Sequence, residues 1–310
     1  MERGFPVADA HCDFLYGMYR YGYDIRTRKD AQTIYLPHMK KGNVRLQFFA
    51  SWMDSALKTP YLQQCISMID AYNRMLEENE ELSPLTRDFD WNGGKIATVL
   101  TVEGGEAIEG SLGALRILKR LGVAAMTLTW NNNNELAFAA MKRQSKGLTA
   151  LGREVVLEME RIGMAIDLSH LSDQGIEDVL ALTTKPVFAS HSNARQVYHT
   201  PRALPDEYIQ EIAARGGVVG VNFFHKQLGA NRCASMQDIV AHILHIVRVG
   251  GDDCCAIGSD FDGMTQYPAD LPHSGEFPAL CEALLCAGLR REQVQKIAFD
   301  NLCTYISAFL

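Results

Sequence analysis

The chain has 310 residues, of which 47% are hydrophobic, and its 30 Lys and Arg against 37 Asp and Glu give a formal net charge of -7. This composition is typical of a globular protein with enough apolar residues for a large core. The acidic balance, without any basic run longer than two residues, argues against nucleic acid and anionic membranes as partners.

The sequence contains no recognisable targeting or membrane segment. No apolar run approaches the roughly 20 residues that a spanning helix needs, and the N-terminus lacks the basic and then apolar layout of a signal peptide. The 8 cysteines are scattered without a Cys-x-x-Cys pair, a pattern typical of proteins from a reducing compartment. We therefore expect a cytoplasmic protein without disulfides.

The first predicted strand begins almost at once and ends in a His-x-Asp pair. It covers residues 7–13, and alternation along it would place His11 and Asp13 on one face with Cys12 on the other. Two such side chains on one face suggest a metal site. A hydrogen-bonded core histidine beside an exposed carboxylate has the same pattern, so the pair gains weight only if other strands end similarly.

Apolar runs and helical spacings alternate along the rest of the chain. Residues 16–41 indicate a long loop with some helix, and a second strand is predicted at 44–52. Six further strands are predicted at 96–102, 123–130, 164–170, 186–191, 218–223 and 255–260. Helical periodicity predicts helices at 61–81, 111–121, 152–161, 172–182, 205–215, 235–249, 278–287 and 291–309.

The eight strands are nearly continuously apolar, which is typical of parallel strands buried on both faces. Their alternation with helices, in a chain somewhat longer than the ~250 residues that such folds take, predicts one α/β domain over residues 1–310. Its fold would be a single TIM-type (β/α)8 barrel with C-terminal helices. An open doubly wound sheet is the alternative, but no G-x-G-x-x-G follows any strand.

Ionisable side chains recur where the predicted strands end. In a TIM-type barrel these ends form the mouth that carries the active site. The residues there are His11, Asp13, Glu103, His170, His191 and Asp260. Three imidazoles and three carboxylates exceed the needs of one tetrahedral ion and suit two ions that share a carboxylate. The alternative is that some of them are structural polar residues.

Five sequence blocks surround these residues: DAHCD at 9–13, VEGG at 102–105, IDLSH at 166–170, ASHSNAR at 189–195 and GSDFDG at 258–263. In order and spacing they closely resemble the membrane (renal) dipeptidase family of zinc-dependent amidohydrolases. The resemblance extends from the first strand to beyond the last. It implies a soluble metallo-dipeptidase that hydrolyses free dipeptides, including some with a C-terminal D-residue, and a family in which homodimers are common.

The resemblance also implies a ligand set for two Zn²⁺ ions. His11 and Asp13 would bind one ion. His170 and His191 would bind the other, and Glu103 would bridge both. These assignments follow the positions of the family motif residue by residue.

Further residues match the catalytic and substrate-binding positions of the family. Asp260 corresponds to the acid/base carboxylate, which would pass a proton from the attacking water to the leaving amine. Arg202 corresponds to the arginine that holds the terminal carboxylate of the substrate. Trp130 and Asn193 are also expected at the substrate site.

Trp130 departs from the family pattern. Better-known members have a histidine at this position, after Leu128-Thr129, that helps to bind the scissile carbonyl. Tryptophan can donate only through its indole N–H. The metal ions alone, or an asparagine of the 131–134 run, would then bind the scissile carbonyl. Trp130 would form a wall of the substrate pocket.

Two alternatives to a dipeptidase remain. Other amidohydrolases, such as deaminases, lactonases and cyclic amidases, often carry His-x-His on strand 1 and a lysine on strand 4, and this sequence has neither. A barrel that has lost its chemistry and acts as a binding protein is disfavoured, because all six candidate positions hold competent ligands.

Overall fold

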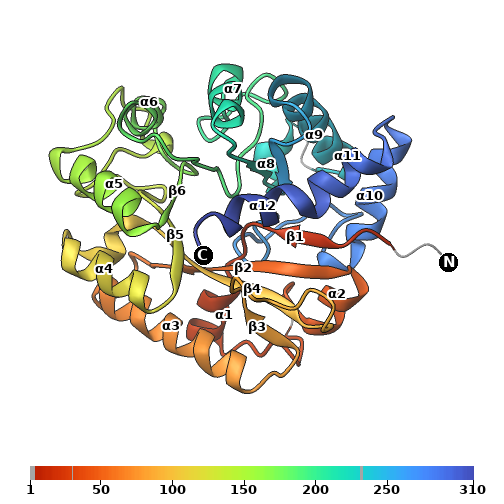
Figure 1. Ribbon diagram of the computed structural model, residues 1–310, viewed down its shortest axis with the longest axis horizontal. Coiled ribbons are helices and arrows are strands. Elements are labelled where there is room, and N and C mark those ends of the chain that lie inside the picture. The colour runs from red at the N-terminus through yellow and green to blue at the C-terminus, as the bar shows by residue number, and fades with distance from the viewer. Residues whose placement is uncertain (1–3, 30, 231–232) are drawn as a thin grey trace.

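The computed structural model describes residues 4–29, 31–230 and 233–310 as a ring of parallel strands surrounded by helices (Figure 1). Seven strands follow one another around the ring in the order β6-β5-β4-β2-β1-β8-β7, and all of their pairings are parallel. Their bounds are β1 Val7–Asp9, β2 Val44–Trp52, β4 Ile96–Glu103, β5 Val123–Thr127, β6 Ala165–Asp167, β7 Val219–Val221 and β8 Cys255–Ile257.

The sixth predicted strand closes the ring without being a regular strand. Phe188 pairs with Asp167 of β6, and Ala189 pairs with Val219 of β7, both in parallel orientation. This sixth-strand segment, residues 186–190, therefore fills the gap between β6 and β7. The predicted (β/α)8 barrel is confirmed, with one of its eight strands reduced to two single bridges.

Two glycines allow the neighbouring strands to approach the end of the sixth-strand segment. A Cβ on Gly220 would lie 2.0 Å from the carbonyl oxygen of Ser190, and one on Gly258 would lie 1.8 Å from the same atom. A backbone oxygen cannot move aside cheaply, so a side chain at either position would push the chain apart just before His191.

Helices cover the outside of the ring, as Figure 1 shows. Several begin at a side-chain cap: Ser111, Thr149 and Ser172 each accept a hydrogen bond from a backbone N–H of the first turn. The α-helices are α1 Phe14–Tyr21, α2 Leu36–Lys41, α3 Tyr61–Glu77, α4 Leu112–Arg120, α5 Ala150–Ile162, α6 Asp173–Leu182, α7 Asp206–Ala214, α8 His225–Leu228, α9 Met236–Gly250, α10 Phe277–Cys286, α11 Arg291–Gln295 and α12 Asn301–Ser307. None of the helices in these ranges is long and apolar enough to cross a membrane.

Short helical segments and one further strand complete the chain. The 3-10 segments are η1 Gly105–Ile108, η2 Ala140–Lys142 and η3 Ser274–Glu276, and the π-helical segment η4 Lys296–Asp300 joins α11 to α12. The strand β3, Leu82–Pro84, was not predicted, because three residues carry too little apolar pattern. It pairs with Ile96–Thr98 at the start of β4, off the path of the ring.

Most of the predicted strands are too long at their C-terminal ends, although β2 has the predicted bounds and β4 is one residue longer than predicted. β1 ends at Asp9 rather than at residue 13, and β8 ends at Ile257 rather than at residue 260. The chain leaves the regular ladder where polar site residues begin. The predicted extent of the first strand is therefore wrong, but His11 and Asp13 both reach the barrel mouth while Cys12 lies in the hydrophobic core, as expected.

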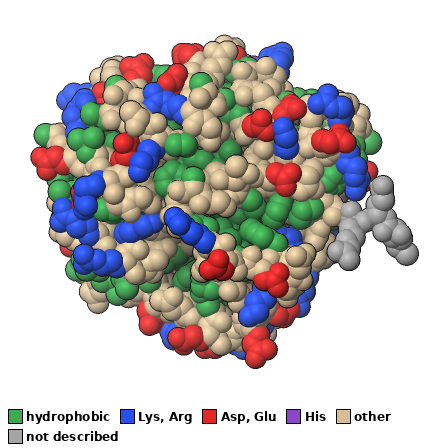
Figure 2. All heavy atoms as spheres, viewed as in Figure 1, with side chains coloured by type: hydrophobic (Ala, Val, Ile, Leu, Met, Phe, Trp, Pro, Cys, Tyr) green, Lys and Arg blue, Asp and Glu red, His purple; other side chains and the backbone are tan. Residues whose placement is uncertain are grey.

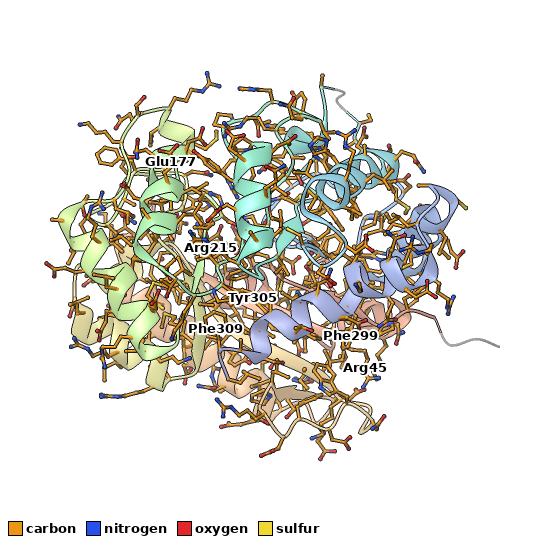
Figure 3. The ribbon with its side chains drawn as sticks, turned by 45° about the horizontal axis from the view of Figure 1, so that its top comes forward. Arg45, Glu177, Arg215, Phe299, Tyr305 and Phe309 are labelled. Carbon is orange, nitrogen blue, oxygen red and sulfur yellow. The ribbon has the colours of Figure 1, made fainter. Side chains whose placement is uncertain are left out.

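The end of the barrel where the strands begin is closed by the C-terminal helices. Early strand residues such as Leu46, Ala97 and Ala165 form one buried cluster with Leu302 and Tyr305 of α12. Figure 1 is viewed from this end, with α12 crossing the ring. Figure 3 shows Tyr305 of α12 and Phe309, which follows the end of that helix. Positive and negative side chains are mixed over this face, with hydrophobic ones between them (Figure 2). The opposite end, where the strands terminate, carries the polar cluster.

Candidate active site

The six ionisable residues predicted at the strand ends converge at the barrel mouth. Five of them are buried, and Asp260 is half-buried. They follow or end β1, β4, β6, the sixth-strand segment and β8, and they are His11, Asp13, Glu103, His170, His191 and Asp260. The ring of parallel strands thus brings together residues from positions 11 to 260 of the sequence.

Glu103, the last residue of β4, lies at the centre of this cluster. Its Oε2 atom is 3.6 Å from Nε2 of His11. Its Oε1 atom is 2.8 Å from Nε2 of His170 and 3.4 Å from Nε2 of His191. One carboxylate oxygen therefore faces His11 and the other faces His170 and His191, as expected for a bridging ligand.

Two carboxylates complete the side of the cluster that contains His11. Nε2 of His11 is 3.7 Å from Oδ2 of Asp13 and 4.0 Å from Oδ1 of Asp260. One ligand atom from each of these three residues lies within 4.8 Å of the other two, and the same holds for His11, Glu103 and His191. Nε2 of His11 and Oδ1 of Asp13 are buried without any hydrogen-bond partner.

Burial controls the protonation of the cluster. Burial, and then the charge of Glu103, raise the pKa of Asp13 to about 8. Burial raises the pKa of Asp260 to about 6, and burial with the charge of Arg202 lowers the pKa of His170 to about 4. At His11, burial opposes the charged form, but the neighbouring carboxylates Glu103 and Asp13 raise the pKa well above its ordinary value. The cluster thus gathers carboxylates with imidazoles whose pKa values are moved in opposite directions.

This arrangement fits a metal ion. Imidazole nitrogens and carboxylate oxygens are the ligands that zinc and related divalent ions take. A divalent ion would satisfy the two orphaned buried atoms, Nε2 of His11 and Oδ1 of Asp13. Its charge would also stabilise the ionised form of the buried carboxylates.

The backbone is held in an uncommon conformation at two of these residues. His170 has a φ of 70°, and Asp260 has a φ of 62°. The left-handed region costs a residue other than glycine of the order of 1 kcal/mol or more, and such strain is concentrated at functional sites. Both side chains are therefore aimed into the cluster by a backbone turn that the surrounding structure maintains.

Asp9, on β1, fixes the position of Asp260. One oxygen of Asp9 accepts a hydrogen bond from the backbone N–H of Ser259 at 2.8 Å, and the other accepts one from the Ser259 hydroxyl at 2.6 Å. Ser259 directly precedes Asp260. No role was predicted for Asp9 from the sequence, although a carboxylate inside an apolar strand must find partners when it is buried.

Asp167, on β6, fixes the positions of His170 and His191 in a similar way. Its Oδ1 atom accepts hydrogen bonds from the backbone N–H groups of Ser169 and Ser190, both at 2.9 Å. These residues directly precede His170 and His191. One buried carboxylate therefore ties together the two chain segments that present both histidines, and this role too was missed.

Neighbouring polar groups orient the imidazole rings. Nδ1 of His170 lies 3.0 Å from the amide oxygen of Asn131, and Nδ1 of His191 lies 2.7 Å from the Ser190 hydroxyl. With Nδ1 engaged, Nε2 of each ring is left to face Glu103, as is usual for metal-binding histidines. Asn131 thus supports His170, and this contact differs from the carbonyl-binding role considered for the asparagine run.

Arg202 is a buried cation beside the candidate metal ligands. It is 5% exposed, and burial lowers the pKa of its guanidinium to about 10. Its Nη2 donates to the carbonyl oxygen of His191 at 3.1 Å and its Nη1 to the hydroxyl of Ser192 at 3.4 Å, while its buried Nε has no partner. In the described part of the chain it forms no salt bridge, so it is suited to bind an anion from outside.

The comparison with known protein families agrees with this geometry. The sequence model of the membrane dipeptidase family, peptidase family M19, matches residues 1–308. The chain belongs to the membrane dipeptidase family. Family membership confirms the resemblance predicted from the sequence blocks and identifies the chain as a hydrolase of the metallo-dipeptidase type, with a metal as cofactor.

The chain is similar to one curated relative and to two solved structures described here. An uncharacterised dipeptidase of Schizosaccharomyces pombe is 34% identical over 291 residues, which cover 86% of this chain and 70% of that protein. The crystal structure of the metallopeptidase dipeptidase AC has a TM-score of 0.91 at 26% identity and 99% coverage of both chains. A Rhodobacter sphaeroides metallopeptidase, solved with a phosphinate mimic of L-Ala-D-Ala, shares the fold with a TM-score of 0.90 at 24% identity and covers 99% of this chain and 100% of that one.

Trp130 and Asn193, the two remaining residues expected at the substrate site, have different surroundings. Trp130 is half-buried beside the cluster, with its ring 6.3 Å from that of His170 and 4.9 Å from that of Trp52. Asn193 is fully buried, and its amide bonds both N–H and C=O of Asn222 and the carbonyl oxygen of Gln227. Trp130 therefore forms a wall of the site, whereas Asn193 fastens the loop after the sixth-strand segment to the loop after β7.

Proposed function

We propose that the protein hydrolyses free dipeptides with the help of two divalent metal ions, and that zinc is the native metal. The observation that carries this proposal is the position of Glu103, whose Oε2 faces His11 and whose Oε1 faces His170 and His191. Six candidate ligand residues also exceed what a single tetrahedral ion takes. A shared carboxylate is the usual centre of a two-metal hydrolase.

In this proposal His11 and Asp13 hold one ion, His170 and His191 hold the other, and Glu103 contacts both. When bound, the ions would lower the pKa of a water molecule and polarise the carbonyl of the substrate. The remaining tasks are to bind the dipeptide, to orient it and to move protons. They belong to other side chains of the site.

Asp260 is the proposed proton carrier. Its Oδ2 atom accepts a hydrogen bond from the amide of Asn222 at 2.9 Å, while Oδ1 is directed toward His11 at 4.0 Å. Burial raises its pKa to about 6, close to neutral pH, where a group can both accept and release a proton during turnover. Asp260 would take a proton from the attacking water and give it to the leaving amine.

Arg202 is the proposed binding site for the C-terminal carboxylate of the substrate. A free carboxylate would provide the buried guanidinium with the counter-charge that it lacks within the described structure, and the bond would be charge-assisted. Arg202 donates to the backbone of His191, so it lies next to the candidate metal ligands. A dipeptide bound in this way would place its single peptide bond over the cluster.

Broader parts of the proposal concern the molecule as a whole. We propose one domain over residues 1–310 and a cytoplasmic location, which the eight free cysteines support. The mimic of L-Ala-D-Ala bound to the Rhodobacter relative makes C-terminal D-residues a reasonable part of the substrate range. A homodimer without nucleic-acid or membrane partners is the expected assembly.

The metal content of a Glu103→Gln variant tests the bridging role directly. An amide is a weaker and uncharged ligand, so we expect about two zinc ions in the wild-type protein and one or none in the variant after dialysis. Metal analysis by mass spectrometry measures both. Glu106→Gln is the control: Glu106 is also buried, its pKa is raised by burial, and it bonds Asn134 rather than the cluster. Wild-type metal content in Glu103→Gln would contradict the proposed bridge.

A further inference from the structure

An aromatic pocket opens directly beside the candidate metal centre. Its volume is about 800 Å³, and Asp13 of the cluster forms part of its wall. Tyr16, Trp52, Trp130 and Tyr267 also line it. These residues follow or end β1, β2, β5 and β8, so one side of the barrel mouth is built largely from aromatic rings.

The rings form a continuous series that leads away from the metal centre. The ring of Trp130 lies 6.3 Å from that of His170, Trp52 lies 4.9 Å from Trp130, and Tyr16 lies 4.8 Å from Trp52. The last two contacts are edge-to-face, the arrangement that aromatic pairs favour. The hydroxyl of Tyr16 donates to Asp54 at 2.6 Å, which fixes the outer ring of the series. The aromatic wall is therefore formed before any substrate binds.

This pocket and Arg202 lie on opposite sides of the cluster. Arg202 bonds to His191, at the end of the sixth-strand segment, whereas Trp52 is the last residue of β2 and pairs in register with Glu103. The order of strands around the ring places the sixth-strand segment across from β2. A dipeptide with its carboxylate on Arg202 and its peptide bond over the cluster would direct its N-terminal residue toward β2.

We propose that the aromatic pocket binds the side chain of the N-terminal residue and selects dipeptides that begin with phenylalanine, tyrosine or tryptophan. This inference rests on the proposed dipeptidase function and adds the substrate class. Aromatic rings can pack against Trp52 and Trp130 both edge-to-face and offset-stacked. The volume of about 800 Å³ accommodates the largest natural side chain.

The charges in the pocket disfavour basic side chains. Arg28 and Lys29 line its wall, together with Asp262. The carboxylate of Asp262 already accepts hydrogen bonds from Thr33 and from the backbone of Ile34. No free carboxylate outside the metal ligand set is therefore available among the described lining residues to pair with a lysine or arginine side chain of the substrate.

A panel of matched dipeptides tests the inference on the zinc-loaded wild-type enzyme. We expect kcat/KM for Phe-Ala and Trp-Ala to exceed that for Ala-Ala and Lys-Ala by about tenfold or more, as burial of an aromatic side chain predicts. The reversed dipeptide Ala-Phe should show no comparable gain over Ala-Ala. The pair Phe-Ala and Ala-Phe thus reports which end of the substrate enters the pocket.

Substitutions of tryptophan connect the preference to the pocket. Trp52→Leu should lower the ratio of kcat/KM for Phe-Ala over Ala-Ala to about threefold or less, because leucine offers no ring face. The conservative variant Trp52→Phe should retain most of the preference. Trp91→Leu is the matched control, since Trp91 packs on Phe89 and on Phe299 near the closed end of the barrel. It should leave the ratio unchanged.

The possible results separate this inference from the function on which it rests. If the zinc-loaded enzyme cleaves none of the dipeptides, the dipeptidase proposal fails and the inference fails with it. If dipeptides are cleaved but Phe-Ala is no better than Ala-Ala, or Ala-Phe is the preferred orientation, the dipeptidase proposal stands and the pocket assignment is overturned. If Trp52→Leu leaves the aromatic preference intact, the pocket assignment is also overturned.

Discussion

Replacement of Asp260 by asparagine is expected to lower kcat for dipeptide hydrolysis by a factor of about 10² or more. The amide has nearly the same shape as the carboxylate, and its oxygen can still accept the hydrogen bond that Asn222 donates at 2.9 Å. It cannot, however, take a proton from water and return it to the leaving amine. The proposed metal ligands are other residues, so the metal content should stay at the wild-type level.

Steady-state kinetics and metal analysis on the same preparation make this result interpretable. Asp253→Asn is the control: Asp253 precedes β8 at the opposite end from Asp260, and its side chain is 83% exposed. It should behave as the wild type. Near-wild-type turnover of Asp260→Asn would remove Asp260 from the acid/base role, and loss of one metal ion would place it among the ligands instead.

Replacement of Arg202 by methionine is expected to raise KM for free dipeptides by roughly 10- to 100-fold, the range that corresponds to losing a hydrogen bond to a charged group. Methionine keeps the apolar stem of the side chain and removes the guanidinium. The candidate metal ligands and Asp260 are unchanged, so kcat should fall much less than KM rises. A rise in KM with little change in kcat indicates loss of substrate binding rather than of chemistry.

A dipeptide amide serves as the internal control for Arg202. The wild-type enzyme should bind the C-terminal amide poorly, because it offers no charge to the buried guanidinium. The variant should discriminate little between the acid and the amide, so that the two losses are not additive. If Arg202→Met raises KM for the amide by the same factor as KM for the acid, the assignment of Arg202 to the carboxylate is contradicted. An unchanged KM for the acid would also contradict it.

The sequence was sufficient to predict the barrel, because most of its strands are apolar on both faces and therefore stand out without any alignment. It was also sufficient to nominate the six residues of the cluster, since parallel strands in a barrel necessarily end at one mouth. Strand length was the weakest part of the prediction. β1 and β8 end before His11 and Asp260. Beyond these ends the backbone no longer forms the regular hydrogen bonds of the sheet.

Contacts between residues far apart in the sequence could not be predicted in this way. Asp9 reaches Ser259, which is 250 positions away, and only the closed ring brings them together. The aromatic series combines Tyr16, Trp52 and Trp130 from three different strand ends. Of these residues only Trp130 was expected at the substrate pocket. Asp9, Tyr16 and Trp52 have ordinary local patterns, so their roles could not be predicted from any single segment.

Hydrolysis of a small dipeptide panel, before and after metal removal, tests the central claim most directly. The panel contains L,L- and L,D-dipeptides, with an N-blocked dipeptide and a tripeptide as controls. We predict that only free dipeptides are cleaved, that a chelator abolishes cleavage, and that zinc restores it at about two ions per chain. Cleavage that survives complete metal removal, or a protein that holds two zinc ions and cleaves none of the dipeptides, would contradict this account.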